Sequence, residues 1–72
     1  MRRVPVESHA ITSVGYDRAT NVLEIEFVDG DVYRYFAVPR RVHQELLAAD
    51  SLGRYFQAQI RDRYGYERVS LT

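Results

Sequence analysis

The stretch DGDVYRYFAVP, residues 29–39, places a turn, a short aromatic strand and a helix start next to one another. Gly30 can adopt the positive φ that a tight hairpin turn requires. Tyr33 and Tyr35 are two residues apart, so their side chains lie on the same face of an extended strand. Pro39 suits the first turn of a helix, because its missing N–H would have no intrahelical partner there. This stretch therefore predicts a β-hairpin that leads directly into a helix.

Two strands are predicted on the N-terminal side of this stretch. Residues 11–16 are rich in β-branched and aromatic side chains, residues 17–21 indicate a turn, and residues 22–28 form the next strand. The second of these strands alternates apolar with acidic residues: Leu23, Glu24, Ile25, Glu26 and Phe27. This period of two predicts a sheet with one apolar face and one face in contact with water.

The register of the second hairpin has two possible solutions. A two-residue loop at Asp29 and Gly30 would place both tyrosines beside the glutamates on the exposed face. A three-residue loop with Gly30 in a bulge would turn both tyrosines toward the core. This second register pairs Ile25 with Tyr33, Leu23 with Tyr35, and Glu24 with Arg34. We favour the bulged register, because it buries both rings and sets opposite charges across from one another.

Helical spacing of apolar residues begins after Pro39. The first predicted helix has an apolar stripe made of Val42, Leu46 and Leu47. The second has an apolar face made of Leu52, Tyr55, Phe56 and Ile60. Asp50 or Ser51 can cap its N-terminus, and Gly65 is the expected stop.

These elements predict one α+β domain spanning residues 1–72. It consists of a three-stranded antiparallel sheet followed by two helices packed on one face, in the order β-β-β-α-α. The expected core comprises Ile11, Val14, Leu23, Ile25, Phe27, Tyr35, Val42, Leu46, Phe56 and Ile60.

Composition excludes several classes of protein. The chain has no cysteine and two histidines far apart in sequence, so we expect no disulfide, no metal site and no cofactor. It has neither a signal peptide nor an apolar run long enough to span a bilayer, so we expect a cytoplasmic protein. Ten arginines balance ten acidic residues, but residues 51–72 hold four arginines against two acids. Any basic surface should therefore involve the second helix.

The order and spacing of several short elements resemble the KTSC domain, over about residues 8–64. The elements are Ser8, Ile11, Gly15-Tyr16-Asp17, Leu23 to Phe27, Gly30, Tyr33-Arg34-Tyr35, Val38-Pro39, and Ala49 to Phe56 through Ile60. That family is named for a C-terminal module of some lysyl-tRNA synthetases and includes stand-alone bacterial proteins. The resemblance implies a small accessory module, and it suggests RNA as a ligand.

Arginines at positions 34, 40, 41, 54, 61 and 63 are interleaved with tyrosines at positions 16, 33, 35, 55 and 64. Aromatic rings can stack on bases while guanidinium groups contact phosphates. We therefore predict binding of a tRNA-like or single-stranded RNA. The candidate contact residues are Arg40, Arg41, Arg54, Arg61 and Tyr16. The alternative is that these residues have no binding role: the tyrosines belong to the core and the arginines are solvated on the surface.

A second hypothesis is a protein-interaction or oligomerisation module with no nucleic-acid ligand. Small size, zero net charge and the occurrence of the resembling domain as an appendage all suit a docking unit. A homo-oligomer is compatible with this class, although nothing in the sequence indicates one.

Ser51 and Gly53 are candidate anion-binding residues, since free backbone N–H groups at a helix start can receive a phosphate. Helix capping by Ser51 is the simpler explanation.

No catalytic residues are predicted, and we expect the protein not to be an enzyme. Ser8 and His9 are adjacent, so in a regular strand their side chains would point to opposite faces. His43 and Glu45 are two apart on a helix and face different directions. The sequence contains no phosphate-binding loop and no serine elbow.

Overall fold

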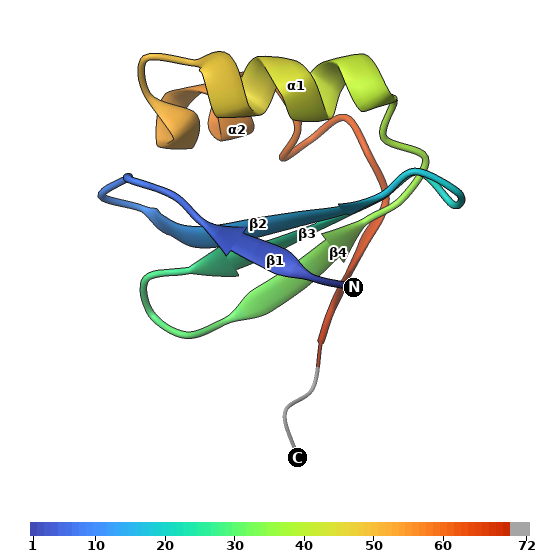
Figure 1. Cartoon of the computed structure of the whole chain (residues 1–72), viewed down its shortest axis with the longest axis horizontal. Coiled ribbons are helices and arrows are strands. Elements are labelled where there is room, and N and C mark those ends of the chain that lie inside the picture. The colour runs from blue at the N-terminus through green and yellow to red at the C-terminus, as the bar shows by residue number, and fades with distance from the viewer. Residues whose placement is uncertain (70–72) are drawn as a thin grey trace.

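The computed structural model describes residues 1–69, which form an antiparallel sheet with two helices on one of its faces (Figure 1). The five strands follow one another in space as they do in sequence, β1-β2-β3-β4-β5. The strands are β1 (Arg3–Pro5), β2 (Ile11–Asp17), β3 (Val22–Phe27), β4 (Val32–Tyr35) and β5 (Tyr66–Arg68). The helices are α1 (Arg40–Ala48) and α2 (Leu52–Gln59).

The α+β class, the three central strands and both helices are confirmed, but the three-stranded sheet was wrong. β1 and β5 add one strand to each edge, and β5 returns to the sheet after both helices. Each has only three residues, too few for an alternating apolar pattern to reveal it. The predicted end of the domain at Thr72 lies outside the described residues.

The bulged register of the β3–β4 hairpin is confirmed. The pairs are Ile25 with Tyr33, Leu23 with Tyr35, and Glu24 with Arg34. Gly30 has a φ of 94°, and the Phe27 N–H donates to the Asp31 carbonyl at 2.8 Å. Both tyrosines therefore lie on the face of the sheet that the helices cover.

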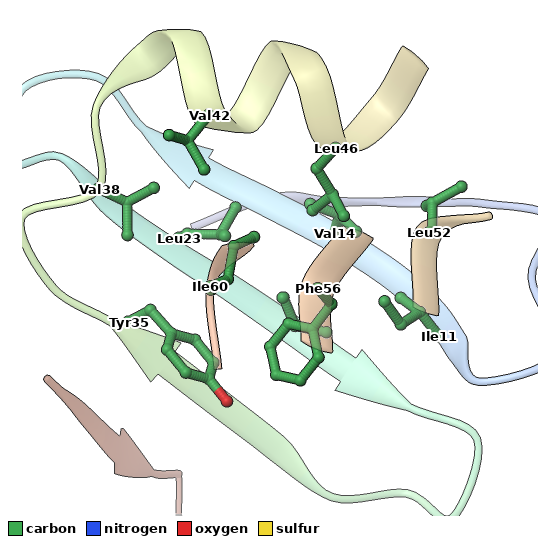
Figure 2. Packing of buried hydrophobic residues seen from close by; sticks show 11 residues of the cluster. Ile11, Val14, Leu23, Tyr35, Val38, Val42, Leu46, Leu52, Phe56 and Ile60 are labelled. Atoms are coloured by element: carbon green, nitrogen blue, oxygen red, sulfur yellow. The ribbon is translucent and has the colours of Figure 1, made fainter. Parts of the chain in front are cut away.

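The core lies between the sheet and the helices (Figure 2). Nine of the ten expected core residues belong to its buried cluster, whereas Phe27 is only partly buried against it. The cluster also contains Val38 and Leu52. Val38 comes from the loop between β4 and α1, where periodicity gives no indication of burial.

Both predicted helix starts are confirmed, and the predicted end of α2 was wrong. Pro39 precedes α1, and the Ser51 hydroxyl accepts a hydrogen bond from the Arg54 N–H at 3.3 Å. α2 ends at Gln59 rather than near Gly65. The N–H groups of residues 60 and 61 both donate to the Phe56 carbonyl at 2.9 Å, so the chain tightens into a turn there. Residues after this turn carry the chain back to the sheet as β5.

Candidate functional site

The four arginines of the predicted RNA surface are all exposed, and they form separate groups. Arg40 and Arg41 begin α1, whereas Arg54 lies in the first turn of α2. α1 has nine residues, a length of roughly 13 Å at the usual helical rise. Its start and its connection to α2 are at opposite ends of the helical layer (Figure 1). Arg61 follows the end of α2 and belongs to neither place.

Tyr16 lies beside the start of α1. Its ring stacks on His43, with 4.7 Å between ring centroids and 12° between ring planes. Its hydroxyl donates to the Val38 carbonyl at 2.6 Å, just before α1 begins. Burial lowers the pKa of His43, which favours the neutral imidazole in this stack. The structure therefore brings Tyr16 together with the Arg40–Arg41 turn.

Only one of the four arginines has an acidic partner within residues 1–69. Arg41 pairs with Glu45 at 3.0 Å, and Glu45 also accepts a hydrogen bond from the Tyr55 hydroxyl at 2.7 Å. These two hydrogen bonds lower the pKa of Glu45. Because Glu45 is exposed, the pair leaves the Arg41 guanidinium accessible.

The two layers differ in formal charge. Residues 39–65, which include both helices, hold five arginines against three acidic residues. Residues 1–38, which form the first four strands, hold four arginines against six acidic residues. The helical layer is therefore the basic side of a chain whose total charge is zero.

The candidate anion residues Ser51 and Gly53 line a cleft of about 490 Å³ between the β1–β2 loop and the start of α2. Glu7 and Asp50 line the same cleft, and their negative charges oppose an anion. Ser51 already caps the helix. A Cβ added at Gly53 would lie 3.3 Å from the Ala10 side chain, so the glycine allows close packing there. Anion binding stays a prediction that these surroundings do not favour.

A larger hollow of about 640 Å³ opens between β4, β5 and the C-terminal end of α2. We call it the aromatic pocket, because its walls contain the rings of Phe27, Tyr33, Tyr35, Phe56 and Tyr66. Consecutive rings touch in a closed circuit, with centroid separations between 5.2 and 5.8 Å. This pocket was not predicted, because Tyr66 belongs to the unexpected strand β5.

Charged residues surround the aromatic pocket. Asp29, Asp31 and Asp62 line it together with one arginine, Arg61. Asp31 forms an ion pair with Arg68, whose guanidinium donates to the carboxylate at 2.8 Å. Of the predicted RNA-binding residues, the structure thus places only Arg61 at this pocket.

The opposite face of the sheet carries a row of paired residues that crosses all five strands. The row is Arg3, Gly15, Glu24, Arg34 and Glu67. Glu24 receives hydrogen bonds from Arg3 at 2.5 Å and from Arg34 at 2.9 Å. Burial raises the pKa of Glu24, but the hydrogen bonds and charges of the two arginines outweigh it, so the pKa is lowered. The Glu24–Arg34 pair was predicted, whereas Arg3 was missed because it belongs to β1.

Three further observations concern the function classes considered above. Within residues 1–69, no three His, Cys, Asp or Glu side chains are grouped so that they could hold a metal ion. The Ser8 hydroxyl accepts hydrogen bonds from the N–H groups of Ala10 and Ile11 at 3.1 and 3.2 Å, so it supports a turn. No helix in the described part of the chain combines the length and the apolar character needed to cross a bilayer.

Comparisons with known proteins agree with this architecture. The model of the KTSC domain matches residues 7–64. An uncharacterized protein of Stutzerimonas stutzeri is 47% identical over 70 residues, which cover 96% of this chain and 99% of that protein. A lysine–tRNA ligase of Trichormus variabilis is 41% identical over 64 residues, which cover 89% of this chain but 11% of the ligase. This chain is 38% identical in sequence to a KTSC domain protein from Yersinia pestis. The crystal structure of that protein matches the fold with a TM-score of 0.91, and the match covers 96% of this chain and 97% of that protein.

Proposed function

This chain belongs to the KTSC domain family, and we propose that it is a non-catalytic module that binds RNA through its helical layer. The exposed arginines of that layer carry the proposal, because Arg40, Arg54 and Arg61 have no acidic partner within residues 1–69. Guanidinium groups in such positions can pair with phosphates. Homology to segments of lysine–tRNA ligases, enzymes whose name specifies a tRNA substrate, supports RNA as the ligand.

The start of α1 is the centre of the proposed interface. Arg40 and Arg41 are neighbours there, and the stacked rings of Tyr16 and His43 hold this turn against the sheet. Both rings are partly exposed, so an unpaired base can stack beside a phosphate that the arginines hold. Such a combination of ring and guanidinium suits single-stranded or loop RNA.

Arg54 and Arg61 extend the interface along the helical layer. The connection from α1 to α2 lies at the opposite end of the helical layer from the start of α1 (Figure 1), so one phosphate cannot contact Arg54, in the first turn of α2, together with Arg40 and Arg41. An RNA strand that crosses the layer would meet the start of α1, Arg54 and Arg61 at separate points. Contacts of this kind depend on backbone charge, so we expect weak sequence preference and strong dependence on salt.

The test measures binding of a labelled single-stranded RNA and of unmodified tRNA at several salt concentrations. We expect binding that weakens with salt, and a double variant R40A/R41A that binds more weakly. Each lost phosphate contact should reduce the slope of log K against log salt by about 0.7 for a single strand. Adding R54A and R61A should reduce the slope further.

The matched control is the double variant R2A/R68A, which removes the same charge from exposed arginines outside the helical layer. This control variant should keep most of the affinity for RNA and most of the slope of log K against log salt. Equal weakening by R2A/R68A and R40A/R41A would show that the interface is not on the helices. Absence of RNA binding by the unaltered protein at low salt would refute the proposal itself.

A further inference from the structure

The aromatic pocket contains a tyrosine whose hydroxyl has no hydrogen-bond partner in the described part of the chain. Tyr35 is 4% exposed, and its hydroxyl takes part in none of the hydrogen bonds within residues 1–69. No side-chain oxygen in the described part of the chain is both sealed from solvent and unpartnered, so this oxygen keeps some contact with solvent, and Tyr35 is one of the residues that line the pocket. Figure 2 shows it directed away from the aliphatic side chains of the core. The pocket therefore offers a hydroxyl at its base.

The charge around the pocket favours a cationic ligand. Three aspartates line it, and their formal charge exceeds that of the two arginines at the pocket, Arg61 on its wall and Arg68 paired with Asp31. Burial, with smaller contributions from Tyr33 and Tyr66, raises the pKa of Tyr35 to about 12, so the phenol is neutral at physiological pH. Aromatic faces attract cations, and guanidinium groups stack on them while pairing with carboxylates.

An arginine of the chain itself already pairs with an aspartate at the edge of the pocket. The Arg68 guanidinium reaches Asp31 at 2.8 Å. Within residues 1–69, no arginine pairs with Asp29 or Asp62, whose residues are exposed on the pocket wall. Asp29 already accepts a hydrogen bond from the Asp31 N–H at 3.0 Å, so its second oxygen and the Asp62 carboxylate are available to a group that enters from outside.

We propose that the aromatic pocket binds the arginine side chain of a partner polypeptide. Its guanidinium stacks on the exposed ring of Tyr66 and pairs with Asp29 and Asp62. The apolar rim explains why the arginine comes from a polypeptide rather than from the free amino acid. Val28 and Tyr66, on two sides of the pocket, are 61% and 60% exposed, and they offer contact area to residues that flank the arginine.

The test is a titration of the labelled protein, followed by two-dimensional amide NMR, with matched peptides. The probe is a capped Val-Arg-Val peptide, and the control is Val-citrulline-Val, which replaces the guanidinium by an uncharged urea of similar shape. We expect shifts at residues 9–10, 28–33 and 61–66 with the arginine peptide, and at least about fivefold weaker binding of the citrulline peptide. Capped arginine alone should bind more weakly than the peptide.

Two variants locate the site. D29N/D62N keeps the size of the side chains and should weaken binding of the arginine peptide at least about fivefold. Y66A should weaken it too, and because Tyr66 is 60% exposed the fold should survive. Equal binding of both peptides, or shifts outside the pocket, would overturn the proposal. The proposal would also be overturned if capped arginine bound as tightly as the peptide. The same holds if uridine monophosphate, and not the arginine peptide, shifted the amide signals of the pocket residues.

This inference does not rest on the proposed RNA binding. The pocket lies at β4, β5 and the end of α2, and it shares only Arg61 with the proposed RNA contacts, whose centre is at the start of α1. R40A/R41A should leave binding of the arginine peptide unchanged, so either proposal can fail without the other.

Discussion

Glu24 is a carboxylate that is almost hidden from water on a sheet face that no helix covers. The residue is 3% exposed, and the helices lie on the opposite face (Figure 1). Arg3 and Arg34 approach it from two sides, and their own side chains remain 32% and 41% exposed. Two charge-assisted hydrogen bonds thus replace the water that the carboxylate loses.

Replacing Glu24 by glutamine should lower the free energy of unfolding by about 1–3 kcal/mol, because both arginines lose their charged acceptor. Urea denaturation at neutral pH measures this change. Since the folded-state pKa of Glu24 is lowered, its contribution is present above the ordinary carboxyl pKa and is lost as the pH falls toward the folded value. The difference between the two proteins should therefore shrink in acid. Glu67→Gln, at a side chain 57% exposed, is the control and should change stability by less than about 0.5 kcal/mol.

At the scale of elements, a glycine in β2 allows the edge strand β1 to approach the sheet closely. Gly15 in β2 lies between Arg3 and Glu24 in the same cross-strand row. A Cβ at this position would lie 2.8 Å from the Arg2 carbonyl oxygen and 3.0 Å from the Arg3 Cγ. The glycine therefore lets the arginine side chain cross β2 and reach the carboxylate in β3.

Gly15→Ala should push β1 away from β2 and cost about 1–3 kcal/mol of unfolding free energy. Amide hydrogen exchange should show faster exchange at Arg3 and Val4, where β1 pairs with β2. Gly65→Ala is the matched control, because nothing lies within 4 Å of the added Cβ. A loss of similar size in both variants would show that the close approach at Gly15 is unimportant.

At the scale of the whole molecule, two layers are joined by a core and, at one end, by an aromatic stack. The core side chains of the sheet meet those of the helices in one buried cluster (Figure 2). Tyr16 from the sheet and His43 from α1 extend this contact to the start of the helical layer. Changes in the charge of His43 should therefore influence how firmly the layers hold together.

Acidification should weaken the fold through His43. Its folded-state pKa is lowered by burial, so between that value and the ordinary histidine pKa the unfolded chain binds more protons. Stability should therefore fall as the pH decreases below the ordinary histidine range, and His43→Gln should reduce this dependence. Thermal unfolding from neutral to mildly acidic pH measures both proteins. His9→Gln, at an exposed histidine, is the control and should leave the pH dependence in place.

Parts of the candidate sites could be predicted from the sequence, because charge and exposure follow from residue type. The arginines at 40, 41, 54 and 61 are exposed as such residues usually are. Their separation into groups was not predictable, since it depends on the direction of two helices. The aromatic pocket was missed for a similar reason: Tyr66 meets Tyr33 and Tyr35 only after both helices have returned the chain to the sheet.

The sequence by itself determined the central strands and the helix starts, and it favoured the hairpin register that forms. These depend on neighbours in the chain: the alternation from Leu23 to Phe27, the turn at Gly30 and the cap at Ser51. Only the tertiary structure decided that β1 and β5 complete the sheet and that Arg3 shields Glu24. Such pairings form between segments distant in sequence through backbone hydrogen bonds, which every residue type except proline can donate and accept, so a three-residue strand leaves little trace in the sequence.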